Sequence, residues 1–345
     1  MNRLKQLVLL PILVLALYGI FYYVEKSSAN QYSNTEVQNF IYKSSTIEPL
    51  EVPSDLDRRK AFLGRELFSD KRLSKGNQVS CHSCHSFEIG GADGRQFSVG
   101  VDGKLGIVNA PTVFNSAKNF KQFWNGREED LFGQIDGPIH DPREMGTTWD
   151  EIVEKLKADQ MMVLLFNEIF DAEISKDRII GALVEFETAL VTEDSPFDLF
   201  LKGDHDALTE SQIAGFRKFE TYGCVACHQG QNIGGNMFQS MGVAFNYFAE
   251  RGGYFESDVG RFVVTGQEHD RHVFKVPSLR NVQLTAPYFH DGSEPSLENA
   301  VRKMARYQLG RKLPKEDIKD ITEFLKSLTG KKPKILSEAY ESVKK

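Results

Sequence analysis

Cysteine is scarce in this sequence, with four residues in a chain of 345. Basic residues are not in excess, because 42 lysines and arginines stand against 48 aspartates and glutamates. The resulting net charge of −6 argues against a nucleic-acid partner, since binding phosphates needs a basic surface. Strand-like alternation is also sparse, whereas amphipathic stretches are frequent. These patterns predict an all-α fold with long loops.

Long hydrophobic runs are limited to one uncharged stretch, residues 7–24, which follows Arg3 and Lys5. The run is longer than a signal-peptide core and reaches the lower limit for crossing a bilayer. Ser27 and Ala29 offer a small-x-small cleavage pattern. A cleaved signal peptide and a retained membrane anchor within residues 1–29 therefore both stay open. Either one predicts that the rest of the chain lies in the periplasm.

All four cysteines fall into two C-x-x-C-H motifs. Two disulfides are the default expectation for an exported chain, but the placement overrides it. The two thiols of such a motif add to the vinyl groups of haem, and the adjacent histidine binds the iron. We therefore predict two covalently bound haem c groups. The predicted attachment and iron-binding residues are Cys81, Cys84 and His85 for one haem, and Cys224, Cys227 and His228 for the other.

A larger unit is repeated around these motifs. Pro111-Thr-x-x-Asn115 is followed, at the same spacing as in the second copy, by Phe-Trp-Asn-Gly126. The second copy reads Pro277-Ser-x-x-Asn281 and then Phe-His-Asp-Gly292. Repeated punctuation of this kind indicates duplicated structural units. We predict two cytochrome c-like haem domains related by internal duplication, at residues 30–195 and 196–345.

Helices are expected ahead of each motif and in the segments that follow it. Thr209 and Gln212 form a capping box, and Ser175 is a candidate N-cap. The stretch from Pro196 to Thr209 is interpreted as a linker. The expected helices are Asp55–Phe68, Trp149–Lys157, Lys176–Val191, Glu210–Thr221, Leu297–Tyr307 and Lys315–Leu328.

The two halves differ in residues able to serve an iron centre. Met304 lies on a helix after Gly292 and is either a distal iron ligand or a core residue. The first half carries an insertion after Gly126, interpreted as a loop rich in glycine and proline. Its Glu144 is either a general acid–base group or a solvated carboxylate.

These motifs and their order resemble the bacterial di-haem cytochrome c peroxidases over residues of about 50–330. The resemblance implies that the N-terminal haem cleaves peroxide and that Met304 is the distal ligand of an electron-accepting haem. It assigns Glu144 and Gln134 to acid–base chemistry above the first iron, and Trp124 to the electron path between the haems. It also implies one calcium ion at the domain interface, and frequent homodimers. The implied calcium residues are Asn109, Thr285 and Pro287, partly through backbone carbonyls.

One position departs from the family. Many members carry a histidine that blocks the first iron until the other haem is reduced, and Val101 stands at the matching place. No histidine or methionine occurs between Ser86 and Ile139. We therefore expect an open or water-bound iron. Other ligands within reach would be Lys104, His140 and Met145.

The histidines outside the motifs are interpreted as non-catalytic. His290 occupies the repeat position of Trp124 and is assigned a structural role, through a hydrogen bond near the domain interface or with a haem propionate. His205, His269 and His272 are expected to be solvated.

The leading hypothesis is reduction of hydrogen peroxide to water with electrons from a small c-type cytochrome or a copper protein. One alternative is a di-haem oxidase that modifies a protein, of the kind that matures the cofactor of methylamine dehydrogenase. An open iron suits that alternative, but it carries tyrosine where this chain has Met304. The other alternative is an electron carrier without a substrate, which would not need Glu144.

Overall fold

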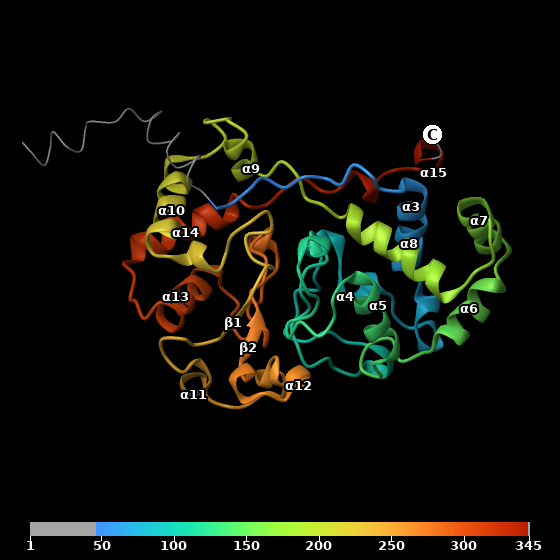
Figure 1. The fold of residues 1–345 in the computed structure, drawn as a ribbon, viewed down its shortest axis with the longest axis horizontal. Helices are drawn as coiled ribbons and strands as arrows, with labels where there is room; N and C mark the ends of the chain where they lie inside the picture. Colours follow the sequence, from blue (N-terminus) through green and yellow to red (C-terminus); the bar gives the residue numbers. More distant parts are fainter. Residues whose placement is uncertain (1–45, 344–345) are drawn as a thin grey trace, which may run out of the picture. The chain divides into compact units, whose positions relative to one another are not determined.

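The structure is a computed structural model that describes residues 46–343 (Figure 1). The predicted signal peptide or anchor, residues 1–29, lies outside the described residues. Within the described part, no helix is long and apolar enough to cross a membrane. We use "first half" for residues 47–195 and "second half" for residues 196–343.

Short helices joined by long loops make up both halves, in agreement with the expected helical class. The helices of the first half are α3 (Arg58–Phe68), α4 (Cys81–Cys84), α5 (Leu131–His140), α6 (Trp149–Lys157), α7 (Gln160–Phe170) and α8 (Lys176–Ala189). Those of the second half are α9 (Pro196–Leu201), α10 (Glu210–Thr221), α11 (Tyr247–Arg251), α12 (Phe262–Thr265), α13 (Leu297–Tyr307), α14 (Lys315–Lys326) and α15 (Tyr340–Val343). Strands β1 (Phe238–Ser240) and β2 (Val273–Lys275) pair antiparallel, with Gln239 opposite Phe274.

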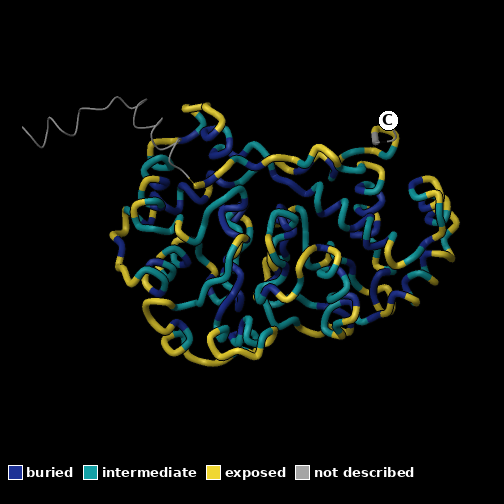
Figure 2. The backbone as a smooth tube through the Cα atoms, viewed as in Figure 1, coloured by how far each residue is buried: buried dark blue, intermediate teal, exposed yellow. Residues whose placement is uncertain are grey.

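Each half is built on one closely crossed pair of helices, α3 with α8 and α10 with α14 (Figure 1). A glycine lies at each crossing. A Cβ atom on Gly64 would collide with the carbonyl of Ala182, and one on Gly215 would collide with that of Asp320. Because glycine has no side chain, the backbones approach closely, and large apolar residues fill the space around the crossing. The buried tube segments in Figure 2 follow these helices.

The repeated sequence motifs adopt the same backbone conformations. Asn115 and Asn281 are both left-handed, with φ of 61° and 59°. Phe123 and Phe289 are also left-handed, with φ of 67° and 72°. The following turns close with matching bridges, Gln122 to Glu128 and Tyr288 to Glu294. The sequence repeat therefore corresponds to a repeat in local structure.

Most of the predicted helices are confirmed. Three have the predicted bounds, namely α6, α10 and α13, and the capping box of Thr209 and Gln212 is present. Helix α3 begins later than expected, at Arg58, because the Asp57 side chain accepts from two backbone N–H groups and caps it there. Helices α8 and α14 each end two residues earlier than predicted. Ser175 is the N-cap residue of α8, although its side chain makes no capping hydrogen bond.

Two segments predicted to be irregular are helical. The stretch from Pro196 was wrongly interpreted as linker, because α9 occupies it. Its Pro196 at the first position and the Ser195–Asp198 capping box are signals for a helix start. The insertion after Gly126 was wrongly interpreted as a loop throughout, because residues 131–140 form α5. Asp130 caps that helix, and Pro138 lies inside it.

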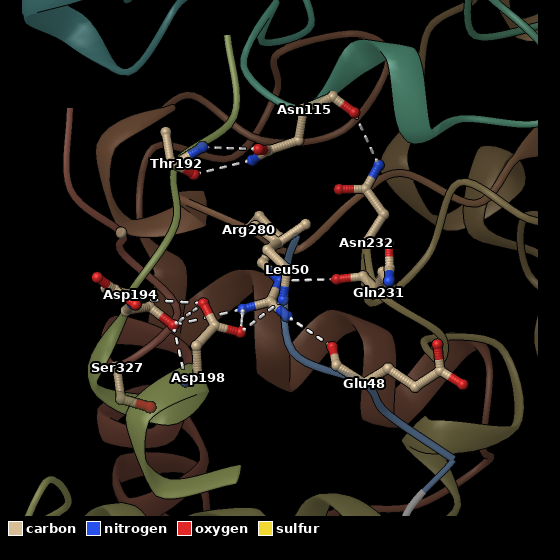
Figure 3. Close-up of polar contacts among 12 residues, drawn as sticks. Glu48, Leu50, Asn115, Thr192, Asp194, Asp198, Gln231, Asn232, Arg280 and Ser327 are labelled. Carbon is tan, nitrogen blue, oxygen red and sulfur yellow. Dashed lines mark hydrogen bonds and ion pairs between the residues drawn. The ribbon is translucent and has the colours of Figure 1, made fainter. Parts of the chain in front are cut away.

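The two ends of the described chain each contact the half to which they do not belong in sequence. Leu50 N donates to Asp198 Oδ1 at 3.1 Å, and Arg280 Nη2 donates to the carbonyl of Glu48 at 3.1 Å (Figure 3). At the other end, Arg65 Nη1 on α3 donates to the carbonyls of Ile335 and Glu338. The predicted boundary at residue 195 is crossed by both segments.

A fully buried ion pair lies under the N-terminal segment. Arg280 Nη1 is 2.8 Å from Asp198 Oδ1, and both side chains are 0% exposed (Figure 3). Beside it, the Thr192 hydroxyl accepts from the side-chain amides of Asn115 and Asn281, each at 2.9 Å. This polar network links Thr192, on the segment between α8 and α9, to the repeated asparagines of both halves.

Candidate functional site

The first C-x-x-C-H motif lines a cavity of about 130 Å³, called here the first-half cavity. His85 Nδ1 donates to the carbonyl of Gly91 at 3.2 Å, since a carbonyl can only accept. This fixes the tautomer and leaves Nε2 free as a metal ligand. Burial lowers the pKa of His85, which keeps the ring neutral, as iron ligation requires.

The second motif lines a larger cavity of about 260 Å³, the second-half cavity. His228 Nδ1 donates to the carbonyl of Ile233 at 3.3 Å, so its Nε2 is free in the same way. Burial lowers the pKa of His228 to about 4. The two histidines therefore have the same tautomer and the same free nitrogen, although their cavities differ in size and lining.

The four cysteines are free thiols and half-buried, so the structure contains no disulfide between them. All four line the two cavities beside their histidines. Burial raises the pKa of Cys81 to about 12 and that of Cys224 to about 11. Two thiols and one neutral histidine at the wall of a mostly apolar cavity fit covalently attached haem.

Lys275 provides a further observation that fits haem, and sequence reasoning missed it. Its side chain is 8% exposed and lines both cavities. No ion pair or hydrogen bond of Nζ is found within residues 46–343. Burial lowers the pKa of Lys275 to about 8, because a buried ammonium without a counter-charge is costly. A haem carries two carboxylates, which would supply that counter-charge.

Trp124 lies where the electron path was predicted, because it lines both cavities. Its Nε1 donates to the carbonyl of Asn109 at 2.9 Å, and its own carbonyl accepts from Lys275 N at 2.8 Å. In the reciprocal contact, the backbone N of Asn109 donates to the carbonyl of His290 at 2.8 Å. The side chain of Trp124 is thus held within the first half, and its backbone is held by Lys275 of the second half.

Glu144 and Gln134 both line the first-half cavity, as expected for the acid–base pair. Gln134 projects from α5, and Glu144 follows that helix in a turn. Burial, and then the nearby Asp141, raise the pKa of Glu144, while Arg127 and Arg143 oppose the rise. The structure brings these two polar groups to the cavity that contains His85. Their catalytic roles stay predictions.

Val101 is buried, at 1% exposure, but does not line the first-half cavity. Its backbone N donates to the carbonyl of Glu144 at 2.9 Å, and its side chain packs over Gly146. A Cβ atom on Gly100 would collide with the carbonyl of Arg143, so glycine allows this close approach. The segment that carries Val101 therefore supports the Glu144 turn from behind.

The three alternative ligands for the first iron lie in different places. Met145 is 5% exposed and lines the first-half cavity. His140 is exposed, and its Nδ1 donates to the carbonyl of Thr147 at 3.2 Å. Neither His140 nor Lys104 lines that cavity. Of the three, Met145 alone has the position of a candidate ligand.

Met304 lines the second-half cavity from α13, together with His228. A second methionine, Met241, lines the same cavity, and sequence reasoning missed it. Met304 has the better support, because a helix fixes its backbone, whereas Met241 lies in the turn after β1. Assignment of Met304 as iron ligand stays a prediction.

The three residues expected to bind calcium all line the second-half cavity. Asn109 Nδ2 donates to the carbonyl of Arg95 at 2.8 Å, and the Thr285 hydroxyl donates to the carbonyl of Val282 at 3.2 Å. Pro287 follows a cis peptide bond. The calcium ion itself stays a prediction.

His290 is buried beside Trp124, with ring centroids 6.4 Å apart, and donates from Nε2 to Asp258 Oδ1 at 2.8 Å. Arg251 pairs with Asp258 and with Asp291, so the buried charges of this cluster are compensated. These contacts agree with the structural role predicted for His290.

His272 was wrongly expected to be solvated. It is half-buried, its Nδ1 donates to the carbonyl of Asp258 at 2.6 Å, and its ring stacks on Phe248 at 4.0 Å. His205 and His269 are exposed, as predicted.

Two C-x-x-C-H cavities on a helical frame define a di-haem c-type protein. The family model described as di-haem cytochrome c peroxidase matches residues 58–206. The chain is 44% identical over 289 residues to the cytochrome c551 peroxidase of Nitrosomonas europaea, covering 83% of this chain and 85% of that protein. It is 42% identical over 314 residues to the cytochrome c peroxidase Ccp of Escherichia coli, covering 90% of this chain but 66% of that protein. The chain therefore belongs to the di-haem cytochrome c peroxidase family.

A solved structure extends this relationship to the fold. A MauG-like protein associated with microbial copper homeostasis superimposes with a TM-score of 0.74 at 30% identity, covering 86% of this chain and 96% of that one. The fold is thus shared with a MauG-like protein.

Proposed function

We propose that the protein reduces hydrogen peroxide to water in the periplasm, with electrons from a small c-type cytochrome or copper protein. Its family consists of peroxidases that carry two haems, and the relatives named above are cytochrome c peroxidases. The observation that carries the proposal is the difference between the cavities. Glu144 and Gln134 line the first cavity together with its haem motif, whereas Met304 lines the second.

When bound, the two haems supply the redox chemistry, and the chain's own residues supply protons and position. Glu144, with its raised pKa, takes a proton from peroxide and returns it to the leaving oxygen. Gln134 donates a hydrogen bond that orients the substrate beside it. Trp124, held between the cavities, provides the path for electrons from the second half to the first.

The same proposal includes the finer features of the chain. The halves arose by internal duplication, which is supported by the matching glycine crossings and left-handed asparagines. One calcium ion binds near Asn109, Thr285 and Pro287. Residues 7–24 direct export, as a cleaved signal or a tether to the inner membrane, and the enzyme forms a homodimer.

Modification of a protein substrate, as in the MauG type, is the second candidate. The absence of a histidine between Ser86 and Ile139 favours it, because an iron without a distal histidine suits that type, but Met145 lines the first-half cavity. Identities of 42–44% to the peroxidases, against 30% to the MauG-like structure, favour peroxide reduction. A carrier without a substrate does not account for a half-buried Glu144 at the wall of the first-half cavity.

Peroxide consumption by the two-haem protein, with and without a reduced donor cytochrome, tests the proposal. A peroxidase consumes peroxide and oxidises the donor in a ratio of one peroxide to two electrons. Denaturing mass spectrometry should first show the polypeptide plus two haem masses. Slow peroxide consumption that the reduced donor does not accelerate would argue for one of the other two activities.

A further inference from the structure

A second carboxyl group lines the first-half cavity. Glu187 lies near the end of α8 and is 6% exposed. The one polar contact of its carboxyl group among the described residues is the hydroxyl of Ser116, which donates to Oε2 at 3.4 Å. No basic side chain of residues 46–343 forms an ion pair with it. The carboxyl is therefore buried with very little compensation.

The second half has an apolar residue at the corresponding place. The crossing of α3 with α8 corresponds to that of α10 with α14, which places Glu187 opposite Leu325 in the comparison. Leu325 lines the second-half cavity, as Glu187 lines the first. Ser116, one residue after the repeated Asn115, likewise corresponds to Val282 after Asn281. Both members of the polar pair are thus replaced by hydrocarbon in the other half.

A carboxylate in such surroundings is unfavourable, because its hydration is lost and no cation replaces it. Burial raises the pKa of Glu187 to about 7, and the Ser116 hydroxyl opposes the rise only in part. The group therefore exchanges its proton in the neutral range. A change of charge inside the cavity would move this equilibrium, because electrostatic interactions are strong in a poorly hydrated interior.

Charged groups outside the cavity have little influence on the protonation of Glu187, so a change of charge inside the cavity is the dominant influence on it. The other titratable groups of the cavity wall are Cys81, Cys84, His85, Glu144 and Lys275. Charged side chains of the elements packed against α8 are paired or exposed elsewhere: Arg65 and Glu66 on α3, Asp136 and His140 on α5, and Glu151 and Lys155 on α6. Lys118, two residues after Ser116, is half-buried and forms no ion pair with Glu187. On α8 itself, Lys176 pairs with Asp136, and Glu185 accepts from Asp57 N. None of these groups forms a hydrogen bond or ion pair with Glu187.

We propose that Glu187 is a redox-linked proton site of the first-half haem pocket. When the first-half haem gains one electron from the donor, the Glu187 carboxylate takes up one proton from water. When the haem is oxidised again, the carboxyl group releases that proton. The proposal depends on haem bound through Cys81, Cys84 and His85, and not on peroxide turnover.

The test is a spectroelectrochemical titration of the two-haem protein at pH values between about 5 and 9. Linkage predicts that the potential of the first-half haem falls with rising pH, with a contribution of up to one proton per electron from Glu187. Glu144 can add a similar dependence, so the key comparison is Glu144→Gln against Glu144→Gln/Glu187→Gln. The double variant should lose the remaining slope near neutral pH.

The matched control is Glu185→Gln, on the same helix, which should retain the full pH dependence. A second variant, Glu187→Leu/Ser116→Val, installs the pair found in the second half and should behave like Glu187→Gln. The second-half haem serves as an internal reference in every titration.

An independent readout is the infrared difference spectrum between reduced and oxidised protein. A carboxylic acid C=O band should appear on reduction and be absent from Glu187→Gln. An unchanged slope in the double variant, or no such band in the parent protein, would overturn the proposal. Because peroxide consumption is measured separately, failure here leaves the peroxidase assignment standing, and the converse also holds.

Discussion

The first-half and second-half cavities share one frame and differ in a few side chains. Both have a neutral histidine fixed through Nδ1, and both lie beside a helix pair crossed at glycine. The first cavity adds the carboxyl groups of Glu144 and Glu187, whereas the second adds methionine and leucine. The comparison teaches that one frame fits haem attachment in both halves, whereas the insertion that carries Glu144 and the exchange of Leu325 for Glu187 give the first cavity its two carboxyl groups.

Glu144→Gln tests the proton-handling side of this difference and has the largest expected effect. Loss of a general acid–base group should slow peroxide turnover by roughly 10²–10⁴ while both haem spectra persist. In the parent protein, turnover should fall as the pH drops through the pKa of Glu144, because the base must be deprotonated and that pKa lies above its usual value. The variant should lose this acidic limb.

Steady-state peroxide assays across pH provide the measurement for Glu144. Glu129→Gln is the control, since that carboxylate is exposed and pairs only with Lys121. Turnover of the Glu144 variant within a few-fold of the parent would show that the proton passes through another group.

Arg280 corresponds in the sequence repeat to Phe114 of the first half, and the Arg280→Phe variant introduces that residue type at position 280. The substitution leaves the buried Asp198 carboxylate without its cationic partner, with only hydrogen bonds such as that from Leu50 N, which should lower the free energy of unfolding by about 3–5 kcal/mol. Chemical denaturation of the two-haem protein, followed by tryptophan fluorescence, measures the change. Asp194→Asn removes partly exposed ion pairs instead, and should cost at most about 1 kcal/mol. Similar values for the two variants would contradict the importance of the buried pair.

Met304→His tests the electron-accepting side. A thioether favours ferrous iron, so its replacement should lower the potential of the second-half haem by part of the roughly 0.8 V range that axial ligands span. Redox titration measures this shift, and the first-half haem should keep its potential. Met241→Leu is the matched control, because Met241 lines the same cavity. A shift in the Met241 variant alone would transfer the ligand assignment to that residue.

Lys275→Met has the smallest expected effect and acts on both cavities. Loss of a buried positive charge should lower both haem potentials modestly, because a cation near haem stabilises the electron gained on reduction. The same redox titration detects it, with the exposed Lys312→Met as control. A shift confined to one haem would show that Lys275 serves only one of the cavities.

Much of the frame could be predicted from the sequence because its signals are local. The C-x-x-C-H motifs mark the attachment sites, and amphipathic periods located α6, α10 and α13 with their ends. Helix α5 was missed because Pro138 and its glycines read as loop, although Asp130 provides a cap. Helix α9 was missed because charged and glycine residues after it resemble a linker.

The missed cavity residues have a different cause. Lys275 and Glu187 are charged types that normally lie at the surface, and only tertiary packing shows that they are buried. The repeat itself held a signal, since Lys275 occupies the place of Asn109, and Glu187 falls on the apolar face of its helix. Glu144, Gln134, Trp124 and Met304 were assigned from the family resemblance, which, unlike periodicity, carries three-dimensional information; all four line a cavity, and their roles stay predictions.

The exchanged chain ends have a consequence for how the protein is made. The contacts of Leu50 with Asp198 and of Arg65 with Glu338 join residues 148 and 273 positions apart. During synthesis the first haem motif is complete long before residues 334–343, which contact α3, have been added to the chain. The packing around α3 is therefore completed only when the last part of the chain is present. For the same reason, each half produced separately would lack the segment of the other half that packs against it. Co-expression of fragments 47–195 and 196–345 should therefore restore folding that neither fragment achieves alone.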